Sequence, residues 1–129
     1  LQDRVKMVGK KSQNEIKELA KNAKAVLVTS RFETFSMVAL EALAMGVPLF
    51  TFDILGLKWV PDNCAIKVSP VSSESLFKSI QKISKSKIDI NLKIKNGLVL
   101  ASNYTWDSVA NKYKNFSHQL LNKNESKFC

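Results

Sequence analysis

The feature that most constrains the fold is a continuous apolar run, Ala25–Thr29, between two segments with helical periodicity. A run without polar alternation is typical of a strand buried on both faces of a parallel sheet. Upstream, Val5–Val8 is a short apolar run ended by Gly9, and Ser12–Glu15 has capping-box spacing at the start of a helix. Strand, helix and strand in this order predict a βαβ unit with parallel strands and a right-handed crossover.

The alternation of strands and helices continues downstream. A helix at about Ser36–Met45 is stopped by Gly46, and strands are predicted at Val47–Phe52 and Ala65–Val68. Helical spacing of apolar residues then predicts three helices at about Glu74–Ile83, at about Leu92–Ser102 and from the cap Thr105 onward. We therefore expect an α/β fold, a Rossmann-like parallel sheet of about four strands with flanking helices.

Length and composition fit one domain, which we place at residues 1–122, with a frayed tail at 123–129. Trp59, Trp106 and the apolar positions of the last helix are expected in the core. The chain starts at Leu1, not at Met, so we expect it to begin partway into a longer product.

The net charge of +9 comes mostly from lysines scattered along helix faces. We interpret it as a solvated surface and expect no nucleic-acid partner, because such sites usually add arginines interleaved with exposed aromatics. Lys58 and Lys67 are assigned to this solvated surface. The one histidine, His118, is expected at the surface or in packing contacts.

The cysteines give no metal-ligand spacing and no disulfide framework, so we expect no metal and no cofactor. Cys64 lies in a strand-like run and Cys129 is the last residue. The most apolar stretch, Met37–Phe52, is interrupted by polar residues and is not a membrane span. A cytoplasmic location follows, either free or at the inner face of the membrane, with peripheral membrane association as one expectation.

The loop Ser30–Phe35 is the segment best placed for chemistry. It follows a buried strand and enters a helix, and ligands of open α/β sheets bind beyond the carboxyl ends of the strands. The first amides of a helix have no partner within it, and with the helix dipole they favour an anion such as a diphosphate. Most loops of this geometry bind nothing, so position alone does not assign a site.

Two carboxylates, Glu33 in the loop and Glu41 in the helix, strengthen the case for a site. A carboxylate beside a phosphate is unfavourable, so these groups are better suited to accept hydrogen bonds from sugar hydroxyls. Glu33 could instead only stabilise the start of the helix. Glu41 needs a partner, because its helix is apolar nearly all round. A hydrolase acid and base pair is disfavoured, since eight helical residues span roughly 12 Å.

The run from Ser30 to Pro48 resembles the Glu-x7-Glu signature of retaining glycosyltransferases with the GT-B fold, of the glycosyltransferase family 4 type. The resemblance extends from Val5 to about Tyr113, and it implies an incomplete GT-B C-terminal domain. It implies a nucleotide-diphosphate sugar as donor, and a glycan or lipid-linked acceptor bound by an N-terminal domain that this sequence lacks. It further implies transfer with retention, by front-face displacement and without a metal.

The resemblance also assigns roles to single residues. Glu33 would bind hydroxyls of the donor sugar and act at the catalytic centre, and Glu41 would bind the ribose. The remaining contacts would come from backbone amides that hold the sugar and diphosphate, at Phe35, Ser36 and Met37, and from a turn lining the nucleobase pocket, at Val8, Gly9 and Lys10. Asp53 either touches the donor or caps the next turn.

The sequence departs from the family in two ways. Ser36 stands where the family usually has glycine, and its side chain either crowds the phosphate or adds a hydrogen bond. Strands 1 and 2 of the family sheet are also missing. We expect direct pairing of the Val5 and Ala25 strands, completion by another copy, or an upstream segment outside this chain. These residues alone are not expected to catalyse transfer, and the alternative is a non-catalytic module that associates with another subunit or copy.

Overall fold

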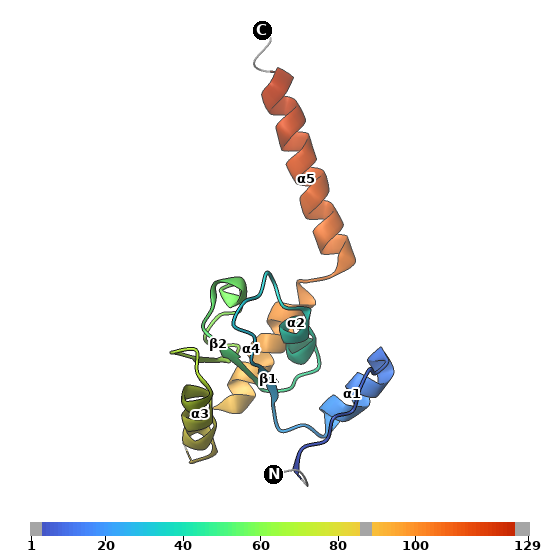
Figure 1. Cartoon of the computed structure of the whole chain (residues 1–129). Helices are drawn as coiled ribbons and strands as arrows, with labels where there is room; N and C mark the ends of the chain where they lie inside the picture. Colours follow the sequence, from blue (N-terminus) through green and yellow to red (C-terminus); the bar gives the residue numbers. More distant parts are fainter. Residues whose placement is uncertain (1–3, 86–88, 126–129) are drawn as a thin grey trace.

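The computed structural model describes residues 4–85 and 89–125 and has an α/β fold (Figure 1). In these residues a three-stranded sheet is combined with five α-helices and the 3-10 helix η2. The α-helices are α1 (Gln13–Lys21), α2 (Met37–Ala44), α3 (Ser73–Lys85), α4 (Ile90–Ser102) and α5 (Trp106–Glu125), and the 3-10 helix is η2 (Leu55–Leu57).

The sheet is parallel, in the order β1 (Val26–Val28), β2 (Leu49–Phe52), β3 (Ile66–Val68). All four residues of β2 are buried, as the continuous apolar pattern of a central parallel strand requires. The parallel α/β character predicted from the sequence is confirmed. All three strands end toward the loops that precede α2, η2 and α3, so those loops share one edge of the sheet.

The prediction of a strand at Val5–Val8 is wrong. The segment is not in a strand, and Met7 is 91% exposed. Among the described residues β1 pairs with β2 alone, so direct pairing of the Val5 and Ala25 strands does not occur. A backbone this exposed can bond to water, and it gains little by entering the sheet. The sheet therefore has three strands where we expected about four.

Helix α1 forms where its capping box predicts. The Ser12 hydroxyl accepts from the Glu15 amide, and the Glu15 carboxylate accepts from the Ser12 amide at 2.9 Å. That backbone hydrogen bond, followed by the one from Lys11, holds the pKa of Glu15 below its ordinary value. Ala20 is the residue that α1 buries, whereas Leu19 on the same helix is 52% exposed. The helix thus lies against the body by a narrow contact.

The core lies between the sheet, α2 and α4. Helix α4 crosses close to α2 at Gly97, where an added Cβ would come within 2.8 Å of a methyl group of Leu43. Glycine usually weakens a helix interior, yet here the missing side chain lets the two helices approach. Lys93 and Asn96 of α4 also donate to backbone carbonyls of the loop before β3, at Asp62, Ala65 and Asn63.

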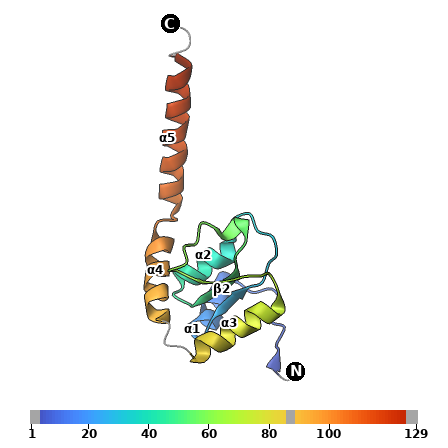
Figure 2. The ribbon, with the colours of Figure 1, turned by 90° about the vertical axis from the view of Figure 1, so that its left-hand side faces the viewer.

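Helix α5 projects from the body along most of its length (Figures 1 and 2). Its apolar residues are not in a core, contrary to expectation, and Trp106 is 89% exposed. The helix has apolar residues at helical spacing but meets no second layer on which to bury them. It runs to Glu125, and residues 126–129 of the predicted frayed tail lie outside the described residues.

Candidate functional site

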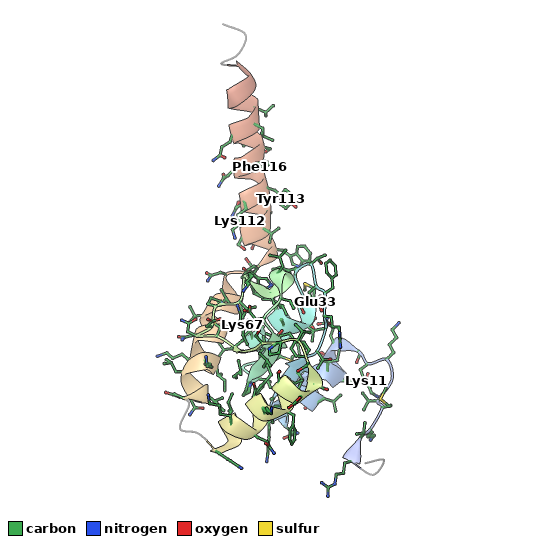
Figure 3. The ribbon with its side chains drawn as sticks, turned by 60° about the vertical axis from the view of Figure 1, so that its left-hand side comes forward. Lys11, Glu33, Lys67, Lys112, Tyr113 and Phe116 are labelled. Carbon is green, nitrogen blue, oxygen red and sulfur yellow. The ribbon has the colours of Figure 1, made fainter. Side chains whose placement is uncertain are left out.

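The loop from residue 30 to residue 36 lies at the carboxyl edge of the sheet, where the sequence placed it. It faces the loop after β2, and together they line a cavity of about 600 Å³. Figure 3 shows Glu33 at the end of the body from which α5 rises. The cavity is lined by Arg31, Phe32, Glu33, Thr34, Ile54, Leu55 and Gly56.

Gly56 is the point at which the two loops touch. A Cβ built at Gly56 would lie 1.8 Å from the carbonyl oxygen of Glu33, a distance that no side chain can adopt. The close approach of the two backbones therefore requires glycine at this position. This contact fixes the distance between the Glu33 backbone and η2, to which Gly56 belongs.

Three aromatic residues support the same loop from outside the cavity. The rings of Phe35 and Trp59 are stacked, with centroids 4.5 Å apart and planes at 16°. The indole N–H of Trp59 donates to the carbonyl oxygen of Phe35 at 2.6 Å. The Tyr104 ring packs on both, with centroids 5.5 Å from Phe35 and 5.1 Å from Trp59. We call Phe35, Trp59 and Tyr104 the aromatic cluster.

Ser36 is the N-cap of α2 and is buried, at 6% exposure. Its backbone has φ 65° and ψ 88°, in the left-handed region that favours glycine. The hydroxyl accepts from the Ala39 amide at 3.4 Å. This hydrogen bond is made to the helix itself, and the two alternatives for the side chain at the phosphate stay predictions. A glycine, which the resemblance leads us to expect at this position, would adopt this left-handed backbone without strain.

Glu41 of α2 does not line the loop cavity. It is half-buried, and its carboxylate accepts from the Gln13 side-chain amide of α1 at 3.4 Å. Met37 and Val38 are 59% and 55% exposed, so α2 is not buried all round as its sequence suggested. Glu41 lines a cavity of about 350 Å³ with Gln13, Ile16, Lys17, Ala44 and Met45.

Val8 lines a third cavity, of about 640 Å³, between the N-terminal segment and α1. Gly9 has φ 64°, which turns the chain toward α1, and Lys10 is exposed. Leu19 lines this cavity and also a cavity of about 210 Å³ that Glu41 lines. The predicted sugar, ribose and nucleobase contacts do not line one common cavity, and their joint use in one donor site stays a prediction.

Sequence reasoning did not single out Gln13 or Tyr104, and it gave Trp59 a core role alone. No spacing rule links Trp59 to Phe35, because their contact depends on how the two loops fold over the sheet edge. Asp53 does not cap the next turn, η2, and its contact with a donor stays a prediction. Its carboxylate accepts from the Lys58 ammonium at 2.8 Å, which lowers the pKa of Asp53. Lys67, expected on the solvated surface, has a side chain only 11% exposed. Its ammonium nitrogen forms an ion pair with a carboxylate oxygen of Asp62 at 3.5 Å.

In the part of the chain that the structure describes, no three side chains among His, Cys, Asp and Glu are grouped as a metal ion would need. Burial raises the pKa of the Cys64 thiol. None of the described helices combines the length and apolar character needed to cross a membrane.

Comparison with known proteins agrees with this arrangement of sheet, loop and helix. The family model described as "Glycosyl transferases group 1" matches residues 1–97. The chain therefore belongs to the group 1 glycosyltransferases, and its fold is the Rossmann-like α/β fold of GT-B enzymes.

Two individual relatives are informative. An uncharacterized glycosyltransferase of Methanocaldococcus jannaschii is 31% identical over 114 residues, covering 78% of this chain and 26% of the relative. The solved structure of sucrose-phosphate synthase from Thermosynechococcus elongatus matches with a TM-score of 0.79 and 27% identity, over 94% of this chain and 31% of that protein. The chain thus spans between a quarter and a third of the length of these relatives.

Proposed function

We propose that this chain supplies the donor-binding part of a retaining glycosyltransferase that transfers a hexose from a nucleotide-diphosphate sugar to a glycan or lipid acceptor. The observation that carries the proposal is the loop with Glu33, held between a parallel strand and the N-terminus of α2 and closed by Gly56. Family membership supports sugar transfer as the reaction.

The proposed chemistry is mainly positioning. Backbone amides at Phe35, Ser36 and Met37 would hold the sugar and the diphosphate, because the first amides of α2 lack partners within the helix. They would also stabilise the charge that develops on the leaving diphosphate. Glu33 would accept hydrogen bonds from sugar hydroxyls, and Glu41 from the ribose. Exchange of the Glu41 partner from Gln13 to the ribose would be required.

A binding experiment on the labelled chain tests this proposal. The ¹⁵N-labelled protein is titrated with UDP-glucose, GDP-glucose and ADP-glucose while the amide shifts of residues 33–41 are followed. We expect shifts in this segment at millimolar concentration with one of the three nucleotides. Glu33→Gln should reduce the affinity for the sugar nucleotide more than the affinity for the matching free diphosphate. Glu74→Gln on α3 is the matched control, since Glu74 pairs with Lys78 on an exposed helix face.

No response to any of the three nucleotides at millimolar concentration would contradict an intact donor site. A response equal for sugar nucleotide and free diphosphate in Glu33→Gln would remove the role given to Glu33.

A second candidate function is a non-catalytic module that associates with another subunit or a second copy. Exposed apolar side chains on β1, α2 and α5 favour it, among them Leu27, Val38 and Phe116. Sedimentation at several concentrations distinguishes the two, because self-association through these faces would raise the apparent mass with concentration.

A further inference from the structure

Of the aromatic cluster, only the Phe35 backbone has a place in the proposed donor contacts, and Trp59 and Tyr104 have none. Trp59 does not line the loop cavity. Yet its indole N–H is bonded to the backbone of the loop, at the Phe35 carbonyl, and its ring is stacked on the Phe35 ring. A side chain that reaches across 24 positions of sequence to hold one backbone carbonyl suggests control of the loop conformation.

The hydrogen bond at Phe35 fixes more than one atom. The carbonyl of Phe35 and the amide of Ser36 belong to the same planar peptide unit, in which C=O and N–H point in opposite directions. With the carbonyl held by Trp59, the Ser36 amide must point away from the indole. The Ser36 amide is one of the groups proposed to bind the diphosphate. Its direction is therefore set by Trp59, which does not line the cavity.

The next peptide unit depends on the same contact. Ser36 holds a left-handed φ of 65°, which is unfavourable for a residue with a Cβ. Such a conformation persists when its surroundings over-determine it. The Trp59 bond acts on one side of Ser36 and the helix cap to Ala39 on the other. Between them they determine where the Met37 amide points.

We propose that Trp59 is a positioning residue, which aims the amides at Ser36 and Met37 toward the donor diphosphate through its hydrogen bond to Phe35. The proposal rests on the proposed donor-binding function. It assigns Trp59 to the geometry of diphosphate binding and leaves direct contact with the donor to the loop.

Tyr104 anchors this arrangement to the root of α5. The Tyr104 ring packs on the rings of Phe35 and Trp59. In sequence, Tyr104 directly precedes Thr105, the residue before α5, and the Lys112 ammonium of α5 lies 5.8 Å from the centre of the Tyr104 ring. The aromatic cluster therefore joins the Phe35 loop to the segment after η2, through Trp59, and to the junction of α4 and α5, through Tyr104. A purely space-filling role for Trp59 would need the rings alone, whereas positioning needs the indole N–H.

Trp59→Phe separates these two roles, because it keeps an aromatic ring for stacking and removes the indole N–H that donates to the Phe35 carbonyl. Trp106→Phe is the matched control, as the same substitution at an 89% exposed tryptophan. In the ligand-free protein we expect Trp59→Phe to shift the Ser36 and Met37 amide resonances, and Trp106→Phe to leave both in place. In the wild type, the Trp59 indole proton should exchange with deuterium more slowly than that of Trp106. Unmoved amide resonances, or equal exchange at the two indoles, would overturn the proposal.

The ligand arm uses UDP, UMP and UDP-glucose, or the corresponding set for whichever base the wild type binds. Loss of one neutral hydrogen bond predicts about fivefold weaker binding of the diphosphate in Trp59→Phe. The monophosphate should lose less, because fewer phosphate oxygens reach the loop. Equal losses for mono- and diphosphate, or none, would contradict positioning. Absence of binding by the wild type would defeat the donor-site function instead, and the ligand-free measurements would still decide whether Trp59 sets the loop.

Discussion

Two regions of the molecule differ sharply in how far their side chains are buried. One is the loop edge of the sheet, and the other comprises the surfaces of α1 and α5. At the loop edge Gly56 meets the Glu33 backbone, Trp59 holds the Phe35 carbonyl and Ser36 is buried. On α5, which stands away from the body, apolar side chains such as Tyr113 and Phe116 face solvent (Figure 3).

The difference shows which parts of the site this chain can determine by itself. The Glu33 loop is fixed by contacts made entirely within the described residues. Glu41 and Val8 line different cavities beside α1, which buries only Ala20. We therefore expect the sugar and diphosphate end of the proposed site to be well ordered in solution, and the ribose and base end to depend on contacts with further structure.

The largest predicted difference comes from the same truncation made in the two regions. Leu57 in η2 is fully buried in the core, whereas Leu120 on α5 is 49% exposed. Leu57→Ala should lower the free energy of unfolding by about 3 kcal/mol, through lost burial and a residual cavity. Leu120→Ala should change it by less than about 0.5 kcal/mol. Urea unfolding followed by circular dichroism measures both.

The comparison fails if Leu120→Ala costs as much as Leu57→Ala at low protein concentration. That result would mean that the apolar side of α5 is buried in solution, against the body or against another chain.

Gly56→Ala tests the contact between the two loops. The added methyl cannot fit beside the Glu33 carbonyl, so one loop has to move, and overpacking of this kind costs about 2 kcal/mol. We expect lower stability in urea and displaced amide resonances throughout residues 31–36. The neighbouring Leu55→Ala is the control, because Leu55 is 87% exposed and loses little on truncation. A Gly56→Ala variant as stable as the wild type, with unmoved loop resonances, would show that the loops are not in contact.

The sequence was sufficient for those parts of the fold that follow from local pattern. The capping box at Ser12, the buried run of β1 and the stop at Gly46 gave α1, the first strand and the end of α2 close to their observed limits. These features depend on residues near one another in the chain. The position of the Glu33 loop at the sheet edge followed from the order of strand and helix.

What the sequence could not give depends on neighbours in space. The pattern of Val5–Val8 suits a strand, but a local apolar pattern does not show whether a segment pairs with a strand edge, and here β1 pairs with β2 alone among the described residues. The spacing of apolar residues in α5 resembles that of a core helix, but periodicity does not reveal whether a second layer is present. The pairing of Trp59 with Phe35 joins residues of two loops, and no local rule predicts it.

Ser36 allows a test of backbone strain at the loop edge with two substitutions at one position. Ser36→Ala keeps the left-handed backbone and loses the cap, so it should cost about 1 kcal/mol. Ser36→Gly relieves the left-handed strain and loses only a few tenths of a kcal/mol of capping, so it should be at least as stable as the wild type. Thermal and urea unfolding measure the difference. A glycine variant less stable than the alanine variant would show that Ser36 is not strained in solution.

The smallest expected effect concerns the ion pair of Asp53 and Lys58 beside the second loop. The Lys58 hydrogen bond lowers the pKa of Asp53, so its stabilisation is complete above the ordinary pKa and is lost as the pH falls through the folded-state pKa. Lys58→Gln should raise the pKa of Asp53 toward its ordinary value, about 3.8. Lys78→Gln, which breaks a comparable exposed pair on α3, should leave it unchanged. Carboxyl ¹³C shifts against pH measure both.

Because Asp53 and Lys58 are largely in contact with water, the shift should shrink as salt is added. A pKa of Asp53 that ignores both Lys58→Gln and salt would mean that the pair does not form in solution. The loop after β2 would then be held by backbone contacts and packing, and its order would no longer depend on charge. A pKa that responds to Lys58→Gln but not to salt would instead mean that the pair is shielded from water, so that the covered region of the molecule reaches beyond the aromatic cluster.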